Sequence, residues 1–171
     1  MHEIEVKLNY QNKEPILKKL KELNAKYKNK FELNDCYFSL EHTDMSNAHD
    51  LLRVRTKGEK SELTFKGKTE STDGIWKRVE INIGIDKGQN MIDILNNLGF
   101  NKISENKSIR EVWMIEDVEF MFIDFTYPDK INIIEVEADS EEKIKKVILQ
   151  FGSLIEKAGE ESFKKFDKKK S

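Results

Sequence analysis

The sequence predicts an α+β protein in which eight short antiparallel strands close into a barrel, with about three helices packed outside it. Two observations lead to this prediction. Most of the chain alternates apolar and polar residues with a period of two, and three segments carry apolar residues at helical spacing. Closing the strands into a barrel is economical because it removes the exposed sheet edges. The alternating segments lie near residues 2–9, 35–40, 51–57, 61–68, 76–84, 107–116, 119–126 and 132–138.

The expected helices lie at residues 16–23, 91–98 and 144–158, where apolar residues recur every three or four positions. Pro15 suits the first turn of a helix, where its missing N–H costs little. Gly99 and Gly159 stand where the second and third helices are expected to end, and Asp139 is expected to cap the third.

The whole chain, residues 1–171, is expected to form a single domain. It contains only two prolines, Pro15 and Pro128, and no Gly/Ser-rich linker that would mark a domain boundary. Lysines at positions 168–170 predict that residues 167–171 form a disordered basic tail.

Composition excludes several classes of function. The 30 basic and 32 acidic side chains leave a formal charge of −2, which argues against a bulk electrostatic grip on nucleic acid or on a membrane. The single cysteine, Cys36, excludes an internal disulfide and a multi-cysteine zinc site. No apolar run approaches the ~20 residues of a membrane span. A cytoplasmic monomer or homodimer is therefore expected.

On five predicted strands the charged residues all fall on one face. The simplest interpretation is that these are the solvent faces of amphipathic strands. However, like charges two residues apart repel on a solvated strand unless an opposite charge lies between them. The alternative is that the helices cover the apolar faces from outside and the charged faces line the barrel interior. The like-charged pairs are Glu3 and Glu5, Arg53 and Arg55, Lys66 and Lys68, and Glu135 and Glu137.

A barrel interior that holds several carboxylates together with several Arg and Lys side chains would be costly to desolvate if it were empty. Paired carboxylates are hard oxygen ligands for Mg²⁺ or Mn²⁺, whereas clustered Arg and Lys side chains bind phosphate oxygens. A polyphosphate with a divalent metal would satisfy both sets.

Several short motifs follow one another in a fixed order along the chain. A Glu-x-Glu-x-Lys signature lies at residues 3–7, and a Glu-x-Glu pair lies at 135–137. Between them lie Asp-x-Tyr-Phe at 35–38, Arg-x-Arg at 53–55, Leu-Thr-x-Lys-Gly at 63–67, Arg-x-Glu at 78–80 and Arg-Glu-Val at 110–112. This ordered set resembles the CYTH, or triphosphate tunnel metalloenzyme, superfamily, which includes class IV (CyaB-type) adenylyl cyclases, thiamine triphosphatases and inorganic tripolyphosphatases. The resemblance covers nearly the whole chain.

The resemblance implies an eight-stranded antiparallel tunnel that binds a triphosphate and one or two divalent metals, Mg²⁺ or Mn²⁺. The metal ligands would be Glu3, Glu5, Glu135, Glu137 and Asp124. The triphosphate would contact Lys7, Arg53, Arg55, Lys66, Lys68, Arg78 and Arg110, and the catalytic residues would be Lys7 and Glu80. The chain departs from the family pattern at Asn82, Ser108 and Phe163, where Glu, Lys and Tyr are usual.

Three functions are open. The first is a divalent-metal-dependent phosphohydrolase acting on inorganic tripolyphosphate or on a nucleoside or thiamine triphosphate. It is favoured because the residues indicate phosphate binding and no adenine pocket can be identified. The second is a class IV adenylyl cyclase that converts ATP to cyclic AMP and pyrophosphate. The third is a non-catalytic polyphosphate-binding module.

Overall fold

The computed structural model describes residues 2–40, 50–68, 70–72 and 74–158, and gives only the backbone of residues 2, 3, 71 and 72. The tail predicted at 167–171, Phe163 and the helix end predicted at Gly159 lie outside the described residues. Among the helices that are described, none combines the length and the apolar character needed to cross a bilayer.

The described chain contains ten strands and three α-helices. The strands are β1 (His2–Asn9), β2 (Lys26–Ser39), β3 (Leu51–Lys57), β4 (Lys60–Lys66), β5 (Glu70–Thr72), β6 (Ile75–Ile85), β7 (Asn101–Ile115), β8 (Val118–Tyr127), β9 (Ile131–Ala138) and β10 (Glu156–Lys157). The helices are α1 (Lys13–Glu22), α2 (Gly88–Asn97) and α3 (Glu141–Phe151).

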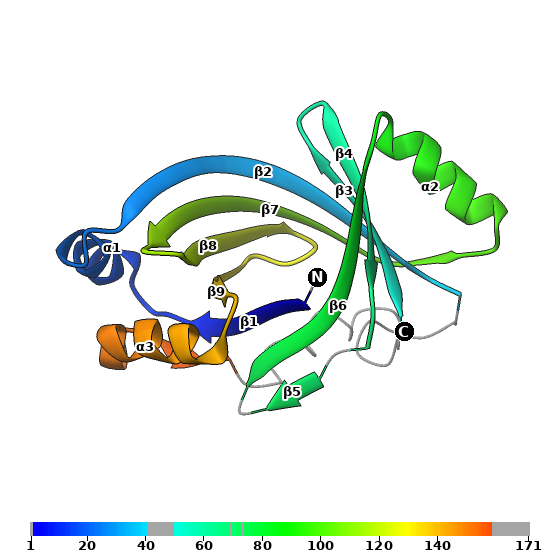
Figure 1. Ribbon diagram of the computed structural model, residues 1–171. Coiled ribbons are helices and arrows are strands. Elements are labelled where there is room, and N and C mark those ends of the chain that lie inside the picture. The colour runs from blue at the N-terminus through cyan, green and yellow to red at the C-terminus, as the bar shows by residue number, and fades with distance from the viewer. Residues whose placement is uncertain (1, 41–49, 69, 73, 159–171) are drawn as a thin grey trace.

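The sheet closes on itself. Its strand order is β10-β1-β9-β8-β7-β2-β3-β4-β6-β5, and β1 also pairs with β6, with Ile4 opposite Lys77. Eight strands therefore form a closed antiparallel barrel (Figure 1), and the short strands β5 and β10 extend it at β6 and β1. The predicted barrel with helices outside it is confirmed.

Strands β2 and β7 are longer than the sequence predicts. They run for 14 and 15 residues and pair along nearly their whole length, so each begins well before the segments expected at 35–40 and 107–116. Residues 26–30 at the start of β2 are exposed, so apolar alternation is absent there. Pairing with β7 and the edge-to-face contact of Tyr27 with Trp113, whose ring centroids lie 5.4 Å apart, hold this part of the strand.

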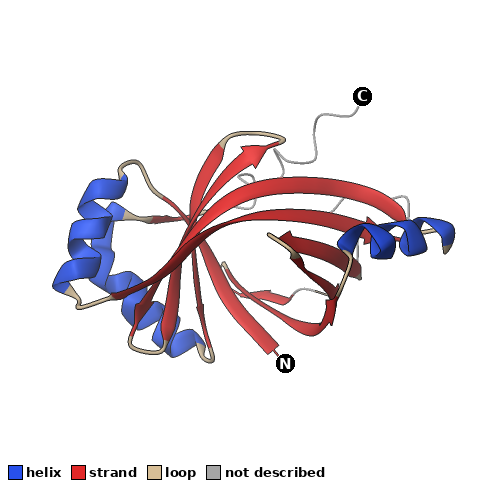
Figure 2. Cartoon of the chain, turned by 90° about the horizontal axis from the view of Figure 1, so that it is seen from above, coloured by secondary structure: helices blue, strands red, loops and turns tan. Residues whose placement is uncertain are grey.

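The helices cover the outer face of the barrel at two opposite ends (Figure 2). At one end α1 and α3 bury Ile16 and Ile144 against the apolar faces of β1, β8 and β9, and Phe120 stacks on Phe151 with ring centroids 4.8 Å apart. At the other end α2 buries Leu95 over apolar residues of β2 and β3. Because the apolar faces point outward to the helices, the charged faces of the same strands point into the barrel.

Helix α3 is shorter than expected and is capped by a different residue. It ends at Phe151 because Gly152 adopts a φ of +52°, and a short 3₁₀ turn then returns Ile155 to the core. The cap is Ser140, whose Oγ accepts a hydrogen bond from the Lys143 backbone N–H at 3.4 Å. Asp139, the predicted cap, instead pairs with Lys143 Nζ at 2.8 Å.

We expect Phe122→Ala to lower the free energy of unfolding by roughly 3–5 kcal/mol, because it removes a fully buried ring from the core under α1 and α3. Urea unfolding measures this change. The control is Leu149→Ala, which truncates a side chain of α3 that is 80% exposed and should alter stability by no more than about 0.5 kcal/mol. Equal losses in the two variants would contradict the described core.

Candidate functional site

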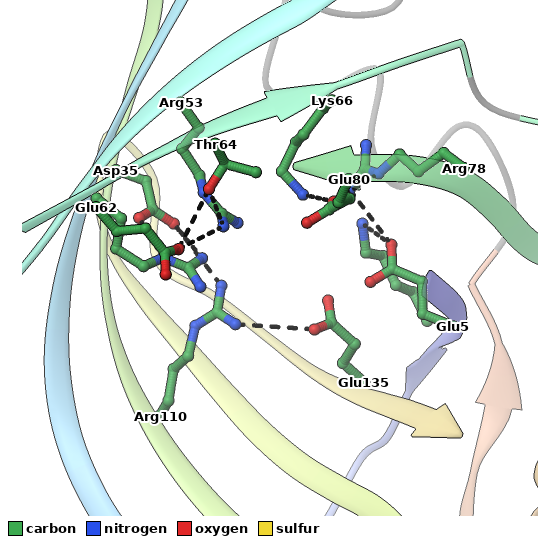
Figure 3. A network of polar contacts seen from close by, with 12 residues as sticks. Glu5, Asp35, Arg53, Glu62, Thr64, Lys66, Arg78, Glu80, Arg110 and Glu135 are labelled. Carbon is green, nitrogen blue, oxygen red and sulfur yellow. Dashed lines mark hydrogen bonds and ion pairs between the residues drawn. The ribbon is translucent and has the colours of Figure 1, made fainter. Parts of the chain in front are cut away.

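Charged side chains from seven strands converge inside the barrel. Figure 3 shows acidic and basic groups pointing toward one another across a shared space. We call this set the lumen cluster: Glu5 of β1, Asp35 of β2, Arg53 of β3, Glu62, Thr64 and Lys66 of β4, Arg78 and Glu80 of β6, Arg110 of β7 and Glu135 of β9. The interpretation that the charged faces line the interior is therefore correct, and these strands are not amphipathic strands with charged faces toward solvent.

One wall of the lumen is organised by Asp35. Its carboxylate accepts two hydrogen bonds of 2.7 Å from Nε and Nη2 of Arg55, and Arg110 Nη2 lies 3.8 Å from Asp35 Oδ2. Burial of Asp35 acts to raise its pKa, but the hydrogen bonds and charge of Arg55 outweigh burial, so the pKa is lowered. Asp35 is therefore an ionised carboxylate that orients two guanidinium groups.

Two guanidinium groups of the lumen have an N–H donor that makes no hydrogen bond to the described residues. Arg53 Nη2 donates to Thr64 Oγ1 at 3.0 Å and lies 3.6 Å from Glu62 Oε1. Yet the Nε atoms of Arg53 and Arg110 are buried and have no hydrogen-bond partner within the described part of the chain. Since a buried donor without an acceptor costs free energy, the lumen is suited to an anion that supplies acceptors.

On the opposite wall Glu80 holds two cations. Its Oε1 accepts hydrogen bonds from Lys66 Nζ and, at 2.9 Å, from Arg78 Nε. Lys66 and Glu80 are both buried. The pairing across β4 and β6, where Lys66 lies opposite Glu80, places these groups together. Glu80 thus positions positive charge along this wall.

A carboxylate-rich wall forms where β1 pairs with β9. Glu5 lies opposite Glu137, and Lys7 lies opposite Glu135. Lys7 Nζ lies 3.2 Å from Glu5 Oε1. Burial acts to raise the pKa of Glu5, but the charges of Lys7 and Arg78 outweigh burial and lower the pKa to about 2. Burial acts to lower the pKa of Lys7, but the charges of Glu5 and Glu135 outweigh burial and raise it. The side chain is therefore a protonated ammonium group.

Glu137 is in the opposite electrostatic situation. Burial, followed by the charges of Glu135, Glu119 and Glu5, raises its pKa to about 7. Glu119 of β8 lies directly opposite Glu137 of β9, and burial and Glu135 raise its pKa as well. Because these like charges repel one another, a cation bound at this wall would stabilise the ionised carboxylates. Sequence reasoning missed Glu119, although the alternation of β8 places it on the same face as Met121 and Ile123.

The structure does not bring together every residue predicted for the site. Asp124 lies on the outer face of β8 beside Phe122, and Tyr10 donates a hydrogen bond to it at 3.4 Å, so it is separated from the carboxylate wall. Lys68 follows the end of β4 and is exposed. The backbone of Glu3 pairs with Arg78, but its side chain lies outside the described residues.

The donor set suits a divalent cation, although the described side chains do not form a closed metal cage: no three His, Cys, Asp or Glu residues among them are gathered closely enough to hold an ion. Glu5 Oε1 is buried and lies 3.2 Å from Lys7 Nζ. Together with Glu135 and Glu137 it offers carboxylate oxygens, the ligands that Mg²⁺ and Mn²⁺ prefer. These residues therefore fit the predicted metal chemistry.

The chain matches the CYTH domain model over residues 1–168. A Methanocaldococcus jannaschii protein named as a proposed adenylate cyclase is 33% identical over 121 residues, which cover 70% of this chain and 67% of that protein. A solved Pyrococcus horikoshii structure is 25% identical, with a TM-score of 0.70 over 90% of this chain and 94% of the other. A Hippeastrum protein proposed as an adenylyl cyclase, and described as having dominant triphosphatase activity, is 18% identical with a TM-score of 0.75 over 96% and 94%.

We expect Asp35→Asn to lower the free energy of unfolding at pH 7 by roughly 3–5 kcal/mol, because Arg55 loses its buried carboxylate partner. Since the pKa of Asp35 is lowered in the folded protein, the stability that it contributes is present above its unfolded pKa of about 3.9 and is lost as the pH falls through the folded value. The difference between wild type and variant should therefore shrink toward acid pH.

Urea unfolding at pH 7 and at about pH 3 measures this difference, since unfolded aspartate titrates near pH 3.9. Asp86→Asn is the matched control, because Asp86 is exposed and its replacement should change little at either pH. A stability difference for Asp35→Asn that stays the same at both pH values would contradict the ion-pair argument.

Proposed function

Because the chain belongs to the CYTH domain family, we propose that it is a divalent-metal-dependent phosphohydrolase that acts on a triphosphate bound inside the barrel. One observation carries the proposal. Buried N–H groups of Arg53 and Arg110 without acceptors among the described residues share the lumen with gathered carboxylates, where burial and the charges of Glu135, Glu119 and Glu5 raise the pKa of Glu137 to about 7. The guanidinium groups favour an anion and the gathered carboxylates favour a cation, and a metal triphosphate supplies both.

The cationic side chains are arranged to hold a chain of phosphates from two sides. Arg53, Arg55 and Arg110 lie on one wall, where Asp35 fixes the last two. Lys66 and Arg78 lie on the other wall, where Glu80 fixes both. Guanidinium forks suit the paired oxygens of phosphate, and lysine ammonium groups act as point charges. The triphosphate therefore lies between the walls.

The predicted catalytic residues Lys7 and Glu80 act through charge in this proposal. Because Glu5 and Glu135 raise the pKa of Lys7, its ammonium group donates to a phosphate oxygen and does not act as a base. Glu80 acts by positioning Lys66 and Arg78. Glu5, Glu135 and Glu137 would hold the Mg²⁺ or Mn²⁺ ion, with Glu119 beside them. When bound, this ion polarises the phosphate and neutralises part of its charge.

In hydrolysis, a water oxygen bonds to the terminal phosphorus while the bond from that phosphorus to the bridging oxygen breaks. The shortened phosphate chain leaves with the bonding electrons, and the proton of the water passes to the products. Preorganised cations stabilise the charge that develops on the phosphoryl and leaving oxygens. Arg53, Arg110 and Lys66, all buried, provide such charges without needing to reorganise.

An adenylyl cyclase is the second candidate, and an apolar cluster inside the barrel favours it. Val112, Met121, Ile123 and Ile133 lie on the inner faces of β7, β8 and β9, with Phe31, Phe125 and Ile131 packed against them. Arg110 Nη1 contacts Met121 Sδ at 3.7 Å, so the cluster borders the phosphate wall. An organic group attached to the triphosphate could pack there while its ribose 3′-hydroxyl attacks the α-phosphorus and releases pyrophosphate. The name of the Methanocaldococcus jannaschii relative points the same way.

Product analysis decides between these functions. The protein is incubated with tripolyphosphate or ATP in the presence of Mg²⁺ or Mn²⁺. Orthophosphate identifies the hydrolase, and cyclic AMP with pyrophosphate identifies the cyclase. Binding of tripolyphosphate without any product would leave the third function, a non-catalytic polyphosphate-binding module.

We expect Glu137→Gln to lower metal-dependent turnover by about 10²–10³-fold, the usual effect of removing one preorganised electrostatic group. The amide keeps the shape of the side chain but removes a charged oxygen ligand, so excess Mn²⁺ should partly restore the rate. Arg53→Ala should also reduce turnover, but no metal concentration should restore it, because the variant lacks a phosphate donor and retains the carboxylates.

Steady-state rates over a Mg²⁺ and Mn²⁺ titration measure this contrast in proteins shown to be folded by circular dichroism. Glu32→Gln serves as the matched control, since Glu32 is exposed on β2 and its replacement should leave the rate unchanged. Full activity of Glu137→Gln would remove this residue from the mechanism.

Tripolyphosphate with Mg²⁺ should stabilise the protein against heat. A ligand that binds only the folded state adds about 2.7 kcal/mol at a hundredfold excess over Kd, which corresponds to roughly 5–10 °C in Tm for a chain of this size. Arg110→Ala should weaken the shift, because one wall of the lumen loses its guanidinium. Differential scanning calorimetry measures both, and a wild-type Tm that does not respond to saturating tripolyphosphate would contradict binding in the lumen.

A further inference from the structure

A second pocket lies outside the barrel, between α2 and the outer faces of β2 and β7. Its volume is about 350 Å³, which is within the range of small-molecule binding sites. None of the side chains that line it belongs to the lumen cluster. The pocket is therefore separate from the site proposed for the triphosphate.

Helix α2 contributes one wall of this outer pocket. Gln89, Ile92 and Asn96 are spaced by three and four residues, so they lie on the same face of the helix. Ile92 also packs against the apolar cluster beneath α2. The wall thus combines one aliphatic surface with two carboxamides.

Strand β2 contributes the floor. Asn34 and Cys36 line the pocket, whereas Asp35 between them points into the barrel and binds Arg55. The Oδ1 atom of Asn34 is buried and accepts no hydrogen bond from the described residues. Because an unsatisfied buried acceptor costs free energy, this atom marks a place where a ligand N–H group would be favoured.

A β-bulge builds the third wall. Pairing between β2 and β7 runs from Tyr37 opposite Ser104 to Phe38 opposite Lys102, so Ile103 has no partner on β2. Because of this extra residue, Lys102 and Glu105 both reach the outer face, where Lys102 Nζ lies 2.9 Å from Glu105 Oε2. The two charges neutralise each other, and the carboxylate disfavours a polyphosphate at this position.

We propose that this outer pocket binds the base of an uncharged purine nucleoside. The carboxamide of Asn96 offers a donor and an acceptor side by side, the pattern with which Asn and Gln recognise the N6 and N7 edge of adenine. Gln89 Nε2 already donates to Asp93 Oδ1 at 2.9 Å, so Gln89 lines the pocket without offering the full pattern. The unsatisfied Oδ1 of Asn34 accepts from the exocyclic amino group, and Ile92 packs on the face of the ring. The balanced charges of Lys102 and Glu105 match a ligand without phosphate.

Calorimetric titration with adenosine tests this proposal, with saturating tripolyphosphate and EDTA present so that the lumen is occupied and no metal-dependent hydrolysis takes place. Asn34→Ala should weaken binding by about tenfold or more. A tenfold change in Kd corresponds to about 1.4 kcal/mol, and a paired contact to a base edge is worth roughly that much or more. Asn96→Ala should weaken it in the same direction. The matched control is Asn90→Ala, which removes an exposed carboxamide of α2 that does not line the pocket and should leave the affinity unchanged.

Cys36 gives a second readout that does not depend on the lumen. It is the only cysteine of the chain, so the rate of its alkylation by iodoacetamide reports on this pocket alone. Adenosine should slow the alkylation, and uridine should slow it much less. Absence of saturable adenosine binding, equal protection by uridine, or equal loss of affinity in Asn90→Ala would each overturn the proposal. So would competition between adenosine and tripolyphosphate, which would place the nucleoside in the lumen.

Discussion

The antiparallel pairing of β1 with β6 is the constraint on which the rest of the structure depends, because it closes the sheet and gives it an interior. Side chains alternate between the two faces of each strand, so closure assigns Glu5 to the inside and Val6 to the helical core outside. A slip of one residue would exchange them. The apolar core under α1 and α3 and the charged lumen are therefore two results of the same register.

Most charges in the lumen are balanced within the barrel, but the balance is incomplete. Asp35 with Arg55, and Glu80 with Lys66 and Arg78, form compact pairs. A buried ion pair gives little net stability compared with well-packed apolar residues, so stability alone does not account for so many buried charges. The proposed phosphate chain would supply acceptors for the unsatisfied N–H groups, and the proposed metal would offset the like charges that raise the pKa of Glu137.

Strand β2 forms a wall common to both candidate sites. Its alternation directs Asp35 inward to the arginines, while Asn34 and Cys36 face the outer pocket beside α2. The two sites share a backbone but no side chain. The bulge opposite Tyr37 and Phe38 places Lys102 and Glu105 together on the outer face, so this local irregularity of pairing gives the outer pocket its polar wall. The inner face of β2, which lines the lumen, is unchanged.

The sequence by itself determined which face carries charge on five of the strands, because a period of two is a local property, and its ordered motifs predicted the barrel and most of the lumen cluster. Matching by motif selected Asp124, although alternation within β8 already places it on the outer face with Phe122. Only the tertiary structure decided that Glu119 meets Glu137, that α3 ends before Gly152, and that a pocket forms beside α2. Strand register and helix placement depend on contacts between distant parts of the chain, and local periodicity carries no information about which residues will meet.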